Sequence, residues 1–149
     1  MKSFFNVADN KELVNRINKL TPENKAQWGK MNVSQMLAHA QVPLKAAIGE
    51  SKLKRGLMGF LFGKIAKKQL MKAEDFKRNL PTDPNFLVKD ERNFEEEKAR
   101  LIALIKRVEK AGASSLAVNP HPFFGKMTET EWDTLQYKHL DHHLRQFGA

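Results

Sequence analysis

The chain has 149 residues, a length that suits one domain burying about two-thirds of the surface that its unfolded form exposes. It contains no cysteine, which excludes disulfides, thiolate metal sites and a cysteine nucleophile. The formal net charge is +9, and residues 51–80 account for most of it with nine basic and two acidic residues, so the excess belongs to one segment and is not typical of a nucleic-acid-binding protein.

The N-terminal residues and the hydropathy of the chain predict its location. Residues 1–13 lack the sustained apolar core of a secretory signal. No later run reaches the roughly 18 apolar residues that a membrane-spanning helix needs. We therefore expect a single cytoplasmic domain over residues 1–149, with no nucleic-acid partner.

Two helices are predicted in the first third of the chain. Asp9 or Asn10 is expected to cap the first of them. Its apolar side is formed by Leu13, Ile17 and Leu20. The second helix begins at Asn32, because Gln35 three residues later completes a reciprocal capping box. Its apolar side is formed by Met36, Leu37, Ala40, Leu44, Ala47 and Ile48.

One histidine falls within the apolar side of the second helix. This residue is His39, and Trp28 lies in an apolar turn before the helix begins. A single histidine in such surroundings is more often a hydrogen-bonded core residue than a metal ligand. The assignment of His39 therefore depends on whether further ligands come from another helix.

Residues 51–72 combine apolar and basic side chains. Gly56, Gly59 and Gly63 lower the helix propensity by roughly 1 kcal/mol each relative to alanine, so we expect an interrupted helix. The segment could pack its apolar side on the domain and leave its lysines in water, it could lie weakly on an anionic membrane surface, or it could contact phosphate. The apolar run 57–62 could also be exposed and mediate a homodimer.

A long connection and a third long helix follow. Residues 76–90 contain two prolines and are predicted to form a crossover loop. Asp90 or Asn93 is then expected to cap a helix. The apolar side of this helix is formed by Phe94, Leu101, Ile102, Leu104, Ile105 and Val108. The next loop, over residues 113–127, contains His121, which lies either in the loop alone or at a site above the helices.

The last predicted helix, over residues 132–147, contains three of the five histidines of the chain. Thr128 and Glu131 fit a capping box ahead of it. His139 and His143 are four residues apart, so their imidazoles leave the same side of the helix one turn apart. Neutral imidazole is the commonest metal ligand in proteins. The pair is therefore a candidate for two aligned ligands, with an ordinary semi-polar helix surface as the alternative.

Four long helices, no convincing strand pattern and long connections predict an all-α fold, a four-helix bundle with long crossover connections. Facing helices in such a bundle can bring His39 to the same point as His139 and His143. Three imidazoles leave at least one coordination position open, as in a catalytic rather than a structural metal site. Ligation by nitrogen alone suits Zn, Ni or Fe.

Trp28, the run SQMLAH that ends in His39, and the run HLDHHLRQ of the last helix form a pattern that resembles the DinB-like superfamily of four-helix bundles. The runs NPHPFFGKMTETEW and YKHLDHHLRQFG are similar to a branch of that superfamily with unknown function. The resemblance covers nearly the whole chain and implies the metal triad His39, His139 and His143. His142 lies outside the spacing of this triad. Some relatives in the superfamily are metal-dependent transferases or isomerases that act with low-molecular-weight thiols.

The leading hypothesis is therefore a metal-dependent enzyme, a hydrolase or a thiol-dependent transferase. A divalent metal would lower the pKa of a bound water or small thiol, and the substrate would be a small molecule such as a low-molecular-weight thiol. The residues predicted to orient the imidazoles or to line the pocket are Gln35, Asp141, His142, His121 and Trp28. The alternative hypothesis is a metal-free helical bundle that binds a small ligand or a protein partner.

Overall fold

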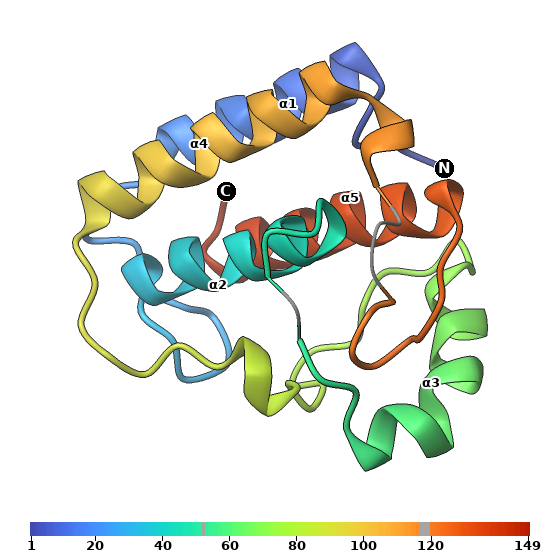
Figure 1. Ribbon diagram of the computed structural model, residues 1–149. Coiled ribbons are helices and arrows are strands. Elements are labelled where there is room, and N and C mark those ends of the chain that lie inside the picture. Colours follow the sequence, from blue (N-terminus) through green and yellow to red (C-terminus); the bar gives the residue numbers. More distant parts are fainter. Residues whose placement is uncertain (52, 117–119) are drawn as a thin grey trace.

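A computed structural model describes residues 1–51, 53–116 and 120–149, and within these ranges the protein is all-helical (Figure 1). Its five α-helices are α1 (Val7–Lys19), α2 (Val33–Ala47), α3 (Leu57–Leu70), α4 (Phe94–Ala111) and α5 (Glu129–Gln146). Two short 3-10 turns, η1 (Pro84–Phe86) and η2 (Ala113–Ser115), lie in the connections. The predicted all-α class is confirmed. Lys52 of the basic segment and Asn119 of the last loop lie outside the described residues.

Side-chain caps fix the first residues of three helices as the sequence predicts. Ahead of α2, Asn32 Oδ1 accepts a hydrogen bond from the backbone N–H of Gln35 at 2.8 Å. In return, Gln35 Oε1 accepts one from the backbone N–H of Asn32 at 3.0 Å. Thr128 and Glu131 form the same arrangement ahead of α5. Of the two residues considered for α4, Asn93 is the cap. Each such cap satisfies backbone donors that have no partner inside the helix.

The predicted start of α1 is wrong by several residues. The cap is Asn6, whose Oδ1 accepts hydrogen bonds from the backbone N–H groups of Ala8 and Asp9. Asn10 is buried inside the helix instead, and its amide donates to the carbonyl of Phe4 at 2.9 Å. Asn6, four residues before Asn10, is therefore the cap because its side chain is available to bond the backbone.

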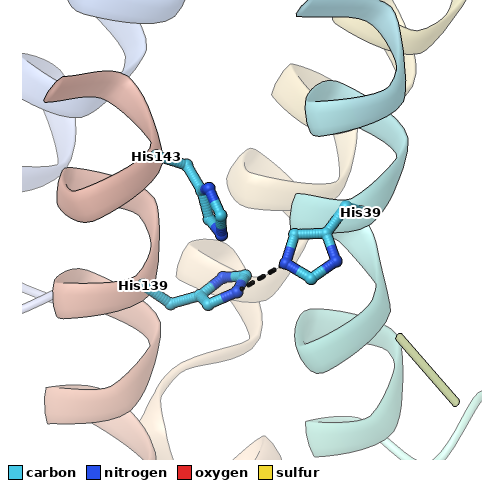
Figure 2. A group of neighbouring side chains, drawn as sticks. All are labelled: His39, His139 and His143. Atoms are coloured by element: carbon cyan, nitrogen blue, oxygen red, sulfur yellow. Dashed lines mark hydrogen bonds between the residues drawn. The ribbon is translucent and has the colours of Figure 1, made fainter. Parts of the chain in front are cut away.

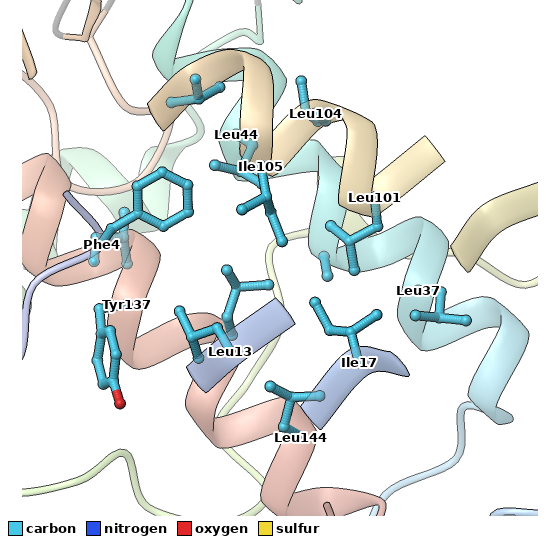
Figure 3. Close-up of a cluster of buried hydrophobic side chains, with 14 of the residues drawn as sticks. Phe4, Leu13, Ile17, Leu37, Leu44, Leu101, Leu104, Ile105, Tyr137 and Leu144 are labelled. Atoms are coloured by element: carbon cyan, nitrogen blue, oxygen red, sulfur yellow. The ribbon is translucent and has the colours of Figure 1, made fainter. Parts of the chain in front are cut away.

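Four of the helices share one hydrophobic core. Helix α2 packs against α4 and α5, and α1 packs against the same two helices. In Figure 1, α1 and α4 run side by side above α2 and α5. The core side chains in Figure 3 include Leu13, Ile17, Leu37, Leu44, Leu101, Ile105 and Leu144. All the apolar positions predicted for these helices are buried except Ile48 and Ile102, which are partly buried.

Helix α3 contributes only Leu70 to this core and contacts α5 and the loop that precedes it. The predicted interruption is wrong, because the helix continues through Gly59 and Gly63. Both glycines are buried, and a Cβ at Gly63 would lie 2.2 Å from the carbonyl oxygen of Phe123. The alternative in which the segment packs its apolar side on the domain is wrong for all of its large apolar helical residues except Leu70. The expectation that the run 57–62 is exposed is confirmed for its large side chains. Among the described helices, none is both long and apolar enough to cross a membrane.

Candidate metal centre

Three histidines from two helices converge inside the protein (Figure 2). His39 comes from the middle of α2, and His139 and His143 come from successive turns of α5. One nitrogen from each ring lies within 4.8 Å of the others, and the Nε2 atoms of His39 and His139 are 3.1 Å apart. The predicted convergence is therefore confirmed. The group has the composition and spacing to hold a metal ion.

The packing of α2 against α5 brings these side chains together. The two helices are also joined by Gln136 of α5, whose buried Nε2 donates to the carbonyl of Pro43 in α2 at 3.1 Å. On α5 the two histidines lie one turn apart, and their ring centroids are 4.6 Å from each other. The meeting of the rings thus depends on the helix periodicity and on the contact between α2 and α5.

The backbone of η1 orients His39. Its Nδ1 lies 2.7 Å from the carbonyl oxygen of Phe86. Because a carbonyl can only accept, Nδ1 carries the proton, and Nε2 presents its lone pair toward the other two rings. This contact was not predicted, since a backbone carbonyl in a loop leaves no signal in the amino-acid sequence.

His143 is oriented by the side chain of Gln146. Its Nδ1 lies 2.8 Å from Gln146 Oε1, and Gln146 Nε2 in turn donates to the carbonyl of Trp28 at 2.6 Å. Gly29 follows with a φ of +82°, a conformation that admits the close approach of Gln146. The Nδ1 of His143 is therefore the protonated nitrogen, and its Nε2 is free to bind an ion. The spacing of three residues on one helix could have indicated this pair from the sequence.

His139 lies with its Nε2 toward His39. Its Nδ1 is buried and forms no hydrogen bond within the described part of the chain. The 3.1 Å separation of the two Nε2 atoms also matches two nitrogens that bind one ion at about 2.0–2.1 Å, which lie roughly 2.8–3.4 Å apart. The three histidines could therefore hold a metal ion that accepts nitrogen ligands.

Burial keeps these imidazoles uncharged at neutral pH. It lowers the pKa of His143 to about 3 and lowers the pKa of His39. The pKa of His139 is well below its usual value, because of desolvation first and of the neighbouring histidines second. Only the unprotonated nitrogen of an imidazole binds a metal, so the triad needs no deprotonation at pH 7.

Two residues predicted to orient the imidazoles have other partners. The side chain of Gln35 is used in the α2 cap and in a 3.2 Å hydrogen bond to the carbonyl of Asp90. Asp141 forms ion pairs with Arg16 at 2.7 Å and with Arg145 at 2.6 Å. Neither residue contacts a triad imidazole in the hydrogen bonds of the described residues, and their predicted role is replaced by that of the Phe86 carbonyl and of Gln146.

His121 organises the loop before α5. Its buried Nδ1 accepts hydrogen bonds from the backbone N–H groups of Phe123 at 3.0 Å and Phe124 at 3.2 Å. Its backbone pairs with that of Gly125 in both directions at 2.9 Å. Burial lowers the pKa of His121 to about 3. Of the two interpretations of the sequence, the structure therefore favours a role for His121 in the loop.

A pocket of about 350 Å³ lies close to the triad, although no triad histidine is among its lining residues. His142 and Trp28 line it, and the ring of His142 lies 5.2 Å from that of His143. The guanidinium of Arg78, another lining residue, lies 4.4 Å from the centroid of the Trp28 ring. Arg145 at the pocket wall pairs with acidic residues, whereas Arg78 takes part in none of the ion pairs found in the described residues. The pocket thus combines an aromatic surface with an available cation.

Comparisons with known proteins identify the family of the chain but indicate no activity. The model of a protein family described as "Protein of unknown function (DUF1569)" matches residues 2–149. No curated protein and no solved structure matches the chain. The function of the site must therefore be inferred from its own residues.

Proposed function

The chain belongs to the DUF1569 family of unknown function, and we propose that it is a metal-dependent enzyme whose divalent metal is held by His39, His139 and His143. The convergence of three inward-facing imidazoles carries this proposal. Two of them are fixed through the far ring nitrogen, and such outer hydrogen bonds are typical of metal-binding histidines. Three protein ligands leave an open coordination position, which favours a catalytic over a structural role.

We also propose that the chain is a DinB-like four-helix bundle with long crossover connections. The shared core of α1, α2, α4 and α5 supports this assignment, with α3 contributing only Leu70 to it. The long connection between α2 and α4 would then be the main crossover. The sequence runs around His39 and along α5 support the same superfamily.

Two groups beside the triad determine which imidazole nitrogen carries the proton. The Phe86 carbonyl keeps a proton on Nδ1 of His39, and Gln146 keeps one on Nδ1 of His143. A divalent metal bound here would lower the pKa of a water or thiol ligand and so supply a nucleophile near neutral pH. His142 lines the pocket and its ring lies 5.2 Å from that of His143, so it could accept a proton from a substrate bound in the pocket.

The pocket indicates a small substrate with an anionic group. Arg78 would bind a carboxylate, and a guanidinium forms short, strong hydrogen bonds with such a group. Trp28 and Phe76 would contact the apolar part of the same molecule. A low-molecular-weight thiol that carries a carboxylate meets both requirements, and the reaction would be hydrolysis or group transfer.

Metal analysis tests this proposal. Protein without a histidine tag would be stripped with a chelator, loaded separately with Zn, Ni and Fe, and washed before its metal content is measured. We expect close to one equivalent of the preferred metal. His39→Ala, His139→Ala and His143→Ala should each lose most of it. His142→Ala, which changes the adjacent histidine on the same helix, should retain it.

Circular dichroism of each variant would show that the helices are still formed. The proposal would be rejected by a metal content far below one equivalent for all three metals in the unchanged protein. It would also be rejected if the three triad variants bound as much metal as the His142→Ala control.

A second function is favoured by one observation. The 3.1 Å between the Nε2 atoms of His39 and His139 is also a suitable hydrogen-bond distance in a metal-free protein. The chain would then be a non-catalytic bundle that binds a small ligand or a protein partner. Calorimetry with carboxylate-bearing thiols would support this function if binding is insensitive to chelator and is weakened by Arg78→Gln. A cytoplasmic location and a homodimer stay predictions from the sequence.

A further inference from the structure

Helix α3 presents its large apolar side chains to solvent. Six of them are between 47% and 74% exposed, and we call them the outer surface of α3: Leu57, Met58, Phe60, Leu61, Phe62 and Ile65. Scattered exposed apolar residues are normal, but six on one helix of 14 residues form a contiguous patch. In Figure 1, α3 projects at the lower right, away from the helices that share the core.

The small residues of α3 face the protein, which leaves its large residues outside. A Cβ at Gly59 would lie 2.7 Å from the carbonyl oxygen of Pro122, and one at Gly63 would lie 2.2 Å from that of Phe123. The backbone of α3 therefore rests directly on the backbone of the loop before α5. No rotation of the helix could bury the outer surface without separating these two backbones.

Polar contacts fix α3 in the same orientation. Lys67 donates to the carbonyl of Lys126 at 2.8 Å and pairs with Glu131 at 3.1 Å. At the C-terminal end of α3, the buried amine of Lys138 donates to the backbone carbonyls of Leu70 at 2.8 Å and of Glu74 at 2.9 Å. These contacts satisfy carbonyls that a helix end otherwise leaves without partners. These contacts therefore hold α3 in the orientation that leaves its outer surface exposed.

The charged residues of this segment have a single sign. Residues 51–73 contain no acidic residue. At 100° per residue, Leu57, Leu61 and Ile65 fall within roughly 80° of arc. The exposed Lys64 and Lys68 lie on the same outer side of the helix. Lysines beside an apolar stripe are typical of helices that lie in the interface of an anionic bilayer.

We propose that α3 binds the surface of an anionic phospholipid bilayer, with the outer surface inserted and the lysines at the headgroups. The helix has 14 residues and is about 21 Å long, too short to cross a bilayer core of about 30 Å. A second copy of the chain fits less well, because two such surfaces face to face would bring the lysines of both copies together.

Co-sedimentation with vesicles tests the proposal. The full chain would be mixed with vesicles of phosphatidylcholine alone and with vesicles that contain phosphatidylglycerol. We expect binding to the anionic vesicles that weakens as the salt concentration rises, and much weaker binding to the neutral ones. Leu61→Gln with Ile65→Gln, which keeps the charge, should reduce binding at least tenfold.

Charge reversal provides a matched pair of variants. Lys64→Glu with Lys68→Glu should reduce binding to anionic vesicles by at least about tenfold. Lys106→Glu with Lys110→Glu makes the same change in net charge at the same spacing on the exposed side of α4, and should bind as the unchanged protein does. This comparison separates the contribution of α3 from the basic charge of the whole chain.

Several results would overturn the proposal. These are no binding to anionic vesicles, equal binding to both kinds of vesicle, or equal losses in the α3 and α4 charge variants. Light scattering would be measured on the same proteins. A dimer that Leu61→Gln with Ile65→Gln dissociates, in a chain that binds no vesicles, would assign the outer surface to a second copy.

Discussion

Gln146 contacts both His143 and the turn at Trp28, and so connects the triad to the pocket wall. We expect Gln146→Ala to weaken metal binding by roughly 10–100-fold, because His143 would lose the acceptor that fixes its ring. Gln146→Glu should restore much of the affinity, since a carboxylate oxygen can accept the same proton. The measurement is a competition between the protein and a chelator of known affinity.

Gln35→Ala is the matched control for this effect. Gln35 was predicted to orient an imidazole, yet its amide caps α2 instead. We therefore expect a small loss of stability and an unchanged metal affinity. Equal affinity losses in the Gln35→Ala and Gln146→Ala proteins would contradict the assignment of Gln146.

His121 should make the metal-free protein sensitive to acid. Its pKa is lowered to about 3 in the folded protein, against about 6.5 in the unfolded chain. The folded state thus binds fewer protons below pH 6.5, so its stability falls as the pH falls from 6.5 toward 3. From pH 7 to pH 5 the loss from this one group is about 2 kcal/mol.

Urea unfolding at both pH values would measure that loss. In His121→Asn the side-chain oxygen can still accept from the backbone N–H two residues on, but it does not titrate. The drop in unfolding free energy between pH 7 and pH 5 should be about 2 kcal/mol smaller in this variant. Identical drops in the two proteins would show that His121 does not carry the expected shift.

The triad residues could be predicted from the sequence, whereas the groups that orient them could not. His139 and His143 follow from a spacing of four on a well-capped helix, and His39 follows from its place among apolar residues. The Phe86 carbonyl belongs to a loop, and its position depends on how residues 76–90 cross the end of α2. No side-chain type marks such a contact, so only the folded chain reveals it.

Helix α3 was the element least well predicted. Helix propensity treats Gly59 and Gly63 as weak points, but the structure uses them for close contact with the backbone near Phe123. Propensity describes an isolated helix and contains no information about a neighbouring chain. The hydrophobic pattern left open whether the run 57–62 is buried or exposed, because it does not say whether an apolar side chain faces the core or solvent.

The variant Gly63→Ala distinguishes the effect of helix propensity from that of the close backbone contact. Propensity alone predicts a gain of about 1 kcal/mol in unfolding free energy. We expect a loss of about 1–3 kcal/mol instead, because the added methyl group would lie 2.2 Å from the Phe123 carbonyl oxygen. Urea unfolding measures the sign, and faster hydrogen exchange of the α3 amides would locate the effect.

Gly56→Ala is the control, because a Cβ at this position meets nothing within 4 Å. Its effect should stay within a few tenths of a kcal/mol, the usual difference for a helix cap without a side-chain bond. A stabilised Gly63→Ala protein would show that α3 does not rest on the loop as described.

The whole molecule places three converging histidines, which could hold a metal ion, beside its hydrophobic core. Helices α2 and α5 contribute both to that core and to the triad, so the packing that stabilises the fold also fixes the histidines. The helical class, the core positions and the converging histidines follow from periodicity and capping. The pocket beside His142 depends on residues far apart in the chain, and only the packed structure brings these together.

X-ray absorption spectroscopy of the metal-loaded, tag-free protein tests the central claim most directly. The triad predicts three imidazole nitrogens at about 2.0–2.1 Å from the metal, with the multiple-scattering pattern of histidine rings, and one or more light atoms in the remaining positions. His39→Ala should reduce the imidazole count by one. A spectrum without imidazole scattering, or one that is the same in the two proteins, would contradict the assignment of these three residues as a metal site.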